Sequence, residues 1–192
     1  MKPVYTFKMD KAIQTMSEMI IQREYKITSE NDDKIIATCK VGQCIVAYKT
    51  PVAKFNVERF KEYISKLEKL NEDVENRQYN HIILVYTDCI TPTGKRMIAE
   101  SVDIKFELFS IDELQFNITK HRLVPLHQKL NDDESKEFKE KFGLKYQAIL
   151  ISDPISRFYN YKRGDIIRIL RQKKNDNNDN KQYIIAYRIV KG

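Results

Sequence analysis

The sequence has little of the residues that several large classes of protein require. Of its 192 residues, only five are glycine and five are proline, which excludes collagen-like and low-complexity chains. No apolar run approaches the roughly 18 residues of a membrane-spanning helix, and the first residues lack the apolar stretch of a secretory signal. We therefore expect a soluble, intracellular protein.

Cysteine and histidine are equally scarce. The three cysteines are an odd number in a chain without a visible signal, which favours reduced, structural thiols over disulfides. Two of them, Cys39 and Cys44, have no histidine nearby, so their spacing does not predict a zinc site. We interpret the three histidines as structural or interface residues: His81, His121 and His127.

The common catalytic and nucleotide-binding motifs are missing. No segment fits the phosphate-binding loop or the dinucleotide glycine fingerprint, and no serine or cysteine triad is visible. A metal-dependent nuclease of the acid-x-Lys type needs a carboxylate where the segment Ala47-Tyr48-Lys49 has alanine. We expect no catalytic residue, no metal and no cofactor.

What the chain does have is a large apolar fraction and an uneven charge. Hydrophobic residues make up 42%, enough for a substantial core, and the net charge is +7. Residues 120–192 contain 17 basic and 9 acidic residues, a net of +8, so the rest of the chain is close to neutral. A basic C-terminal part suits either nucleic acid or an acidic protein surface.

The N-terminal part predicts an alternation of helices and buried strands. Helices are expected over 7–22, 56–70 and 95–100, the first with Phe7, Ile13, Met16, Met19 and Ile20 on one face. A hairpin is expected over 35–49, a strand buried on both faces over 81–87 and a further strand over 104–109. Residues 28–34 and 71–80 are interpreted as exposed loops. This order predicts an α/β domain over residues 1–115.

The C-terminal part predicts a small α+β domain over residues 116–192. One helix is expected over 131–142 and ends at Gly143. A second, short helix is expected to begin at Pro154. A tight turn over 162–165 leads into strands over 166–171 and 183–190, which an Asn/Asp-rich hairpin loop over 173–181 connects.

Two groups of residues point to binding. The segment Thr91-Pro92-Thr93-Gly94-Lys95-Arg96 combines hydroxyls, a helix start and two cations, as phosphate contacts do, although an ordinary capped turn explains it equally well. Five basic residues of the C-terminal domain are expected to form a basic binding face, although an ordinary solvated surface explains them equally well. They are Arg157, Lys162, Arg163, Arg168 and Arg188.

Three C-terminal segments resemble the assembly domain of the fifth subunit of eukaryotic RNA polymerases, a family with an archaeal counterpart that lacks the eukaryotic jaw domain. They are Asn117-Ile118-Thr119-Lys120-His121-Arg122-Leu123-Val124-Pro125-Leu126-His127; Asp153-Pro154-Ile155-Ser156-Arg157-Phe158-Tyr159 with Lys162-Arg163-Gly164-Asp165-Ile166-Ile167-Arg168-Ile169; and Tyr183-Ile184-Ile185-Ala186-Tyr187-Arg188-Ile189-Val190. More weakly, the N-terminal part resembles that jaw domain, which is similar in fold to restriction-type nucleases without their active site.

This resemblance implies a noncatalytic polymerase subunit, cellular or from a large DNA virus. The assembly domain would dock on the largest subunit, and the jaw would lie beside downstream DNA, in the nucleus or, for a virus, in the virion and host cytoplasm. The family usually has glycine where Asn160 stands, Ser-Ala where Thr93-Gly94 stands, and a shorter turn in place of residues 173–181.

The resemblance also assigns candidate site residues. Those expected near DNA are Thr91, Pro92, Thr93, Lys95 and Arg96. Those expected at subunit interfaces are His121, Val124, Pro125, His127, Asp153, Pro154, Arg157, Lys162, Arg163, Gly164, Arg168, Tyr187 and Arg188. The alternatives are a free-standing nucleic-acid-binding protein that uses the basic C-terminal domain, and a nuclease.

Overall fold

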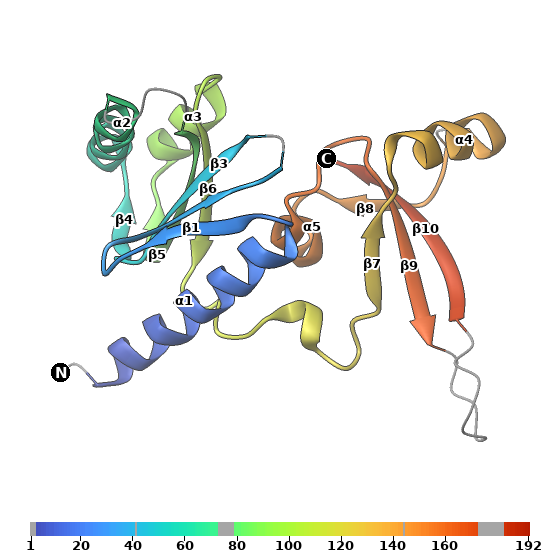
Figure 1. Ribbon diagram of the computed structural model, residues 1–192, viewed down its shortest axis with the longest axis horizontal. Helices are drawn as coiled ribbons and strands as arrows, with labels where there is room; N and C mark the ends of the chain where they lie inside the picture. Colours follow the sequence, from blue (N-terminus) through green and yellow to red (C-terminus); the bar gives the residue numbers. More distant parts are fainter. Residues whose placement is uncertain (1–2, 41, 73–78, 144, 173–182) are drawn as a thin grey trace. The chain divides into compact units, whose positions relative to one another are not determined.

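The chain folds into two compact units, Met1–Phe116 and Asn117–Gly192, each with its own sheet (Figure 1). The structure is a computed structural model that describes residues 3–40, 42–72, 79–143, 145–172 and 183–192. The expected hairpin loop over 173–181 lies within residues 173–182 and so outside the described residues, as does most of the loop expected over 71–80.

The N-terminal unit contains a mixed six-stranded sheet in the order β1-β2-β3-β5-β4, with β6 also paired to β5. Strand β2 runs antiparallel to both β1 and β3, whereas β3, β4 and β6 each run parallel to β5. The strands are β1 (Lys26–Glu30), β2 (Lys34–Thr38), β3 (Cys44–Tyr48), β4 (Val52–Phe55), β5 (Tyr79–Ile90) and β6 (Lys105–Ser110).

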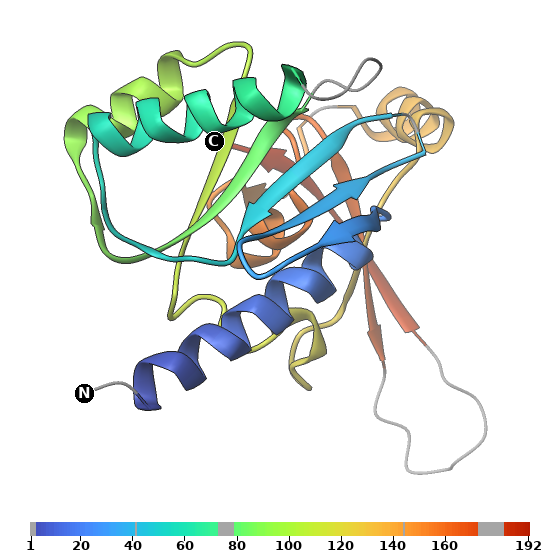
Figure 2. The ribbon, with the colours of Figure 1, turned by 60° about the vertical axis from the view of Figure 1, so that its left-hand side comes forward.

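Helices cover both faces of this sheet (Figure 2). On one face α2 (Val57–Glu72) and α3 (Pro92–Glu100) pack over a core that includes Tyr48, Ile82 and Leu84. On the other lies α1 (Pro3–Gln22), whose buried residues recur at helical spacing and are Met9, Ala12, Thr15, Met16, Met19 and Ile20. Burial on both faces explains the continuous apolar sequence of β3 and of residues 82–86 in β5.

A buried cluster of charged groups lies on the α1 side of the sheet. Arg23, just after α1, donates to both carboxylate oxygens of Glu107 on β6, at 2.9 and 2.8 Å. His81 on β5 approaches the same carboxylate, with Nε2 2.5 Å from Oε1. The side chain of Arg23 is 3% exposed and that of Glu107 is 11% exposed. His81 therefore has a structural role, as expected for it.

Burial alone would raise the pKa of Glu107, but the charge of Arg23 and the hydrogen bond and charge of His81 outweigh it. Together they lower the pKa of this carboxyl to about 2. Glu107 is thus a buried carboxylate that keeps its charge because its partners satisfy it.

Several expectations for this unit need correction. Phe7 does not face the core: it is 60% exposed, and Lys11 Nζ lies 4.4 Å from the centre of its ring. The stretch over 28–34 is not simply loop, because β1 occupies its first part as a polar edge strand. The short strand β4 was not expected, since four residues carry too little periodicity to be recognised. Helix α3 begins at Pro92 rather than at residue 95, with proline in its first turn.

The C-terminal unit contains a four-stranded sheet in the order β7-β9-β10-β8, and β10 pairs antiparallel with β9 but parallel with β8. Its elements are η1 (Ile118–Lys120), β7 (Leu126–Lys129), α4 (Asp132–Phe142), β8 (Ala148–Leu150), α5 (Pro154–Tyr159), β9 (Ile166–Gln172) and β10 (Tyr183–Lys191). The three-residue strand β8 was not expected, because only its pairing with β10 defines it.

The two helices of this unit pack on opposite faces of its sheet. Helix α5 contributes Ile155 to a core with Ile167 and Ile169 of β9. Helix α4 contributes Phe138 to a second core with Ile166. Since side chains of a strand alternate between faces, even- and odd-numbered residues of β9 belong to different cores.

The end of the first expected helix at Gly143 and the turn expected over 162–165 are confirmed. Gly143 follows α4 with a φ of 69°, and the helix begins with a reciprocal capping box of Asn131 and Glu134 that was not expected. The turn before β9 has Gly164 at a φ of 90°, a conformation that glycine adopts more readily than residues with a Cβ. Among the described helices, none is long and apolar enough to cross a membrane.

Candidate binding surfaces

The start of α3 is tied closely to β4. Thr91 caps the helix: its hydroxyl accepts a hydrogen bond from the Gly94 N–H at 3.0 Å and donates to the Phe55 carbonyl at 3.2 Å. A Cβ at Gly94 would lie 3.0 Å from both the Phe55 carbonyl oxygen and the Thr91 hydroxyl, so the close approach requires a residue without one. Thr91 is therefore committed to holding the helix.

The other residues expected near DNA lie at the surface of this helix start. Pro92, Thr93, Lys95 and Arg96 are all exposed. Arg96 makes only a loose ion pair with Glu100, 3.6 Å away on a solvated face. Thr93 and the two cations thus remain accessible to a polyanion, unlike the hydroxyl of Thr91.

The position of the missing nuclease carboxylate lies inside the sheet. Ala47 is fully buried in β3, between Ile35 of β2 and Ile83 of β5 in the strand register. Lys49, two residues on, is paired with Glu30 at 2.7 Å. Among the described residues, no group of three His, Cys, Asp or Glu side chains is arranged to hold a metal ion.

In the C-terminal unit, some of the expected interface residues gather around His127. The Pro125 carbonyl accepts a hydrogen bond from Nδ1 of His127 at 2.7 Å. Burial lowers the pKa of His127, against the opposing effects of that hydrogen bond and of the Asp153 charge. Asp153 also caps α5 through the Ile155 N–H at 2.8 Å, with Pro154 in the first turn. His127 and Asp153 are both half-buried.

A second group forms the turn before β9. Lys162, Arg163 and Gly164 are exposed, and Asp165 accepts the Lys162 N–H at 2.7 Å. Asp165 also pairs with Lys129 of β7 at 2.9 Å. The two basic side chains at the head of the turn therefore project into solvent from a rigid loop.

The remaining strand residues of the expected interface do not share one face. Arg168 pairs with Glu134 at 3.3 Å on the α4 side, and Tyr187, its register partner on β10, packs against the ring of Phe138. Arg188 lies on the α5 side, where it donates to the side chain of Gln147. The expected interface is thus spread over two faces and a turn. His121 is exposed, whereas Val124 and Arg157 are half-buried.

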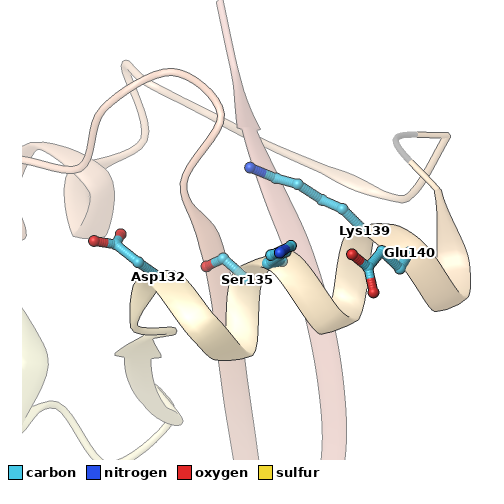
Figure 3. A pocket seen from close by; sticks show the side chains of 5 residues that line it. Asp132, Ser135, Lys139 and Glu140 are labelled. Carbon is cyan, nitrogen blue, oxygen red and sulfur yellow. The ribbon is translucent and has the colours of Figure 1, made fainter.

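The outer face of α4 also forms a shallow surface depression (Figure 3). Its side chains carry both signs of charge and belong to Asp132, Ser135, Lys136, Lys139 and Glu140. Acidic residues lie in the first turn of the helix and basic ones in the last, which complements the helix dipole. We interpret this face as a solvated helix surface.

One surface feature was not expected from the sequence: an exposed apolar segment at the start of β10. Tyr183, Ile184 and Ile185 are 49%, 57% and 53% exposed. The sequence predicts a strand here but not its exposure, because sequence alone does not show which strands lie at the edge of a sheet. The signal that was available is the absence of a polar residue on either face over these three positions.

Comparisons with known proteins point to one family along the whole chain. Residues 116–190 match the family model of the RNA polymerase Rpb5 C-terminal domain. A putative DNA-directed RNA polymerase subunit of invertebrate iridescent virus 6 is 31% identical over 193 residues, covering 94% of this chain and 98% of the relative.

Cellular relatives align over most of their length too. The subunit rpabc1 of RNA polymerases I, II and III from Dictyostelium discoideum is 29% identical over 82% of this chain and 86% of the relative. The corresponding protein of Caenorhabditis elegans is 24% identical over 96% of both chains. With a family-specific C-terminal domain and a viral relative matched almost end to end, the chain belongs to the Rpb5 family, the fifth subunit of multisubunit DNA-directed RNA polymerases.

Proposed function

We propose that this chain is a noncatalytic, accessory subunit of a multisubunit DNA-directed RNA polymerase, whose C-terminal unit docks on the largest subunit. The observation that carries the proposal is the viral match over 94% of the chain, because a relative of nearly the same length is named as such a subunit. The chemistry of RNA synthesis then belongs to other subunits. The chain would act in the nucleus if it is cellular, and in the virion and host cytoplasm if it is viral.

The charge of the C-terminal unit supports a docking role. Lys162 and Arg163 project from a turn that a glycine and an aspartate hold in place, so little backbone order has to be gained on binding. His127 and Asp153 form a half-buried group that contributes shape rather than a strong positive charge. Both groups belong to the expected interface.

We also propose that the N-terminal unit is the jaw and derives from a nuclease-like fold without an active site. The antiparallel β1-β2-β3 meander followed by the parallel strand β5, with α1 and α2 on opposite faces, supports this relationship. The alanine at position 47 and the pairing of Lys49 with Glu30 support the loss of metal-dependent cleavage.

Copurification tests the subunit role. The tagged full-length chain, expressed in its native cells or infected host, is expected to retain the largest polymerase subunits through a wash at roughly 0.5 to 1 M salt, which screens charge-driven contacts. An independent nucleic-acid-binding protein would instead be washed off these subunits and would elute alone. Recovery without any large polymerase subunit contradicts the proposal.

The start of α3 is proposed to lie beside downstream DNA. Replacing Lys95 and Arg96 together with alanine is expected to leave assembly intact, because both side chains are exposed. Elongation complexes should become less stable on all templates alike, since phosphate contacts carry no sequence information. The slope of log affinity against log salt should fall by about 2, for two lost cationic contacts.

The control variant is Thr91→Ala. It removes the cap and the bond to the Phe55 carbonyl, so it is expected to destabilise the N-terminal unit by about 1 kcal/mol without changing the salt slope. Crosslinking from position 93 to template downstream of the active site provides the direct measurement. If no crosslink forms in an active polymerase, this helix start has no DNA-binding role.

A further inference from the structure

The strand β10 leaves part of the C-terminal sheet without a neighbour. It runs from Tyr183 to Lys191, and β9 pairs with it as far as Ile189. On the other side β8 pairs only with its last three residues, from Ile189 onward. Within the described part of the chain, no strand lies beside residues 183–187 on that outer side (Figure 1).

Backbone hydrogen bonds at the end of β10 fix which groups face this open edge. Val190 donates its N–H to the Asp165 carbonyl, on the β9 side. Ile189 donates to the Gln147 carbonyl, on the β8 side. Since backbone groups of an antiparallel strand alternate in direction, odd-numbered residues of β10 face the β8 side and even-numbered ones face β9.

The N–H groups of Ile185 and Tyr187 therefore point away from the sheet. The Tyr187 carbonyl already accepts a bond from its neighbour Arg188 at 3.3 Å. The two N–H groups and the Ile185 carbonyl have no described strand opposite them. A short extended segment is the ligand that such a row of donors and acceptors fits.

The side chains along the edge are apolar on both faces. Ile184 on the α5 side and Ile185 on the α4 side are each more than half exposed. The register continues the apolar row from Ile185 across Leu170 of β9 to Leu126 of β7, which is 50% exposed. Natural edge strands usually carry charged residues or proline that prevent pairing with other chains, so this edge is built to be covered.

The charge of the sheet indicates the character of the covering segment. Its four strands contain five basic residues and no acidic one, namely Lys129, Arg168, Arg171, Arg188 and Lys191.

Intramolecular carboxylates neutralise only part of this charge. Arg168 and Lys129 have partners of opposite sign in Glu134 and Asp165. Arg171, the register partner of Ile184, is exposed and pairs with no carboxylate among the described residues.

We propose that an extended segment of another polymerase subunit, with successive apolar residues opposite Ile184 and Ile185 and carboxylates beside them, adds to this sheet as a strand along residues 183–187. The inference rests on the proposed function, because it names how the C-terminal unit holds its partner. Backbone bonds to Ile185 and Tyr187 supply affinity. Apolar side chains of the segment cover Ile184 and Ile185, and its carboxylates meet Arg171.

Hydrogen exchange tests the strand addition without any mutation. Amide exchange of Ile185 and Tyr187 is measured in the isolated chain and in the assembled polymerase. We expect at least about tenfold slower exchange of both amides on assembly, as an edge amide gains a strand partner. The Ile184 amide, which faces β9, is expected to be protected in both samples and serves as the internal control. Equal exchange of Ile185 and Tyr187 in the two samples overturns the proposal.

Two substitutions at one position separate backbone pairing from side-chain packing. Ile185→Pro removes an N–H that faces the open edge, so the sheet tolerates it, but it blocks an added strand. Ile185→Thr keeps that N–H and a β-branched side chain. We expect the proline variant to bind the largest subunit about tenfold or more weakly than the wild type. The loss of affinity in the threonine variant is expected to be several times smaller than the loss in the proline variant. Equal losses would show packing without strand addition.

The outcomes also separate this inference from the proposed function. If the proline variant assembles with undiminished affinity, the strand addition is wrong and the subunit role stands. If the unmodified chain fails to associate with the polymerase, the subunit role itself fails. A concentration-dependent dimer of the isolated chain that the proline variant abolishes would assign this edge to a second copy and overturn the choice of partner.

Discussion

Replacing Glu107 with glutamine is expected to lower the free energy of unfolding of the N-terminal unit by about 3–5 kcal/mol at pH 7. Glutamine has nearly the same shape, but it leaves the Arg23 guanidinium, 3% exposed, buried without this counter-charge. Breaking one side of a buried ion pair costs this much because the remaining charge stays desolvated. Native-state hydrogen exchange of the amides of residues 82–85 in the core of β5 measures the loss.

The same carboxyl predicts an acid dependence. Its pKa is about 2 in the folded unit and lies near the ordinary 4.5 when the chain is unfolded. A lowered folded pKa means that the stabilising contribution is fully present above about pH 4.5 and is lost as the pH falls toward 2. The difference between the folded and unfolded pKa corresponds to about 3 kcal/mol of stability. The free energies of unfolding of wild type and Glu107→Gln should therefore differ by about this much less in acid than at pH 7.

A matched control is available on the surface of the same unit. Asp112 pairs with Lys8 at 2.9 Å, but the side chains are 74% and 45% exposed. Asp112→Asn is therefore expected to cost less than about 1 kcal/mol, as exposed pairs do. If the Glu107 variant behaves like the Asp112 variant, the buried cluster does not hold α1 to the sheet.

A fragment of residues 117–192 is expected to bind the largest polymerase subunit with an affinity within about tenfold of that of the full chain. A fragment of residues 1–116 is expected to bind it at least about a hundredfold more weakly than the full chain. The C-terminal fragment includes an entire sheet with cores on both faces and carries the proposed interface residues. Pull-down of the purified subunit with each tagged fragment measures the two affinities.

Circular dichroism of both fragments provides the control for this experiment, since a fragment that does not fold cannot report on binding. Each unit has its own buried core, so both are expected to melt cooperatively. Strong binding by folded residues 1–116 alone would reverse the assignment of docking to the C-terminal unit.

Much of the local structure could be predicted because short-range signals determine it. Three such features are the helical spacing of Phe60 and Leu67, the helix end at Gly143 and the glycine at position 164, and each depends on neighbours within a few residues. The family resemblance of the C-terminal part rested on motifs of the same local kind. These features needed no knowledge of the fold.

Tertiary pairing decided the features that carry the functional argument. Glu107 lies 84 positions after Arg23, with His81 between them, and no local sequence pattern connects the three residues. The packing of α1 against β5 and β6 brings them together. In the sequence Thr91 is one candidate among five for a DNA contact, but in the structure its hydroxyl bonds to a carbonyl 36 residues away.

The open edge of β10 likewise exists because β8 is only three residues long. The sequence by itself determined which segments prefer helix or strand, where the caps and turns lie and which family the C-terminal motifs resemble. Whether a strand lies at an edge was decided only in the tertiary structure, because it depends on long-range hydrogen bonds that form in the folded unit.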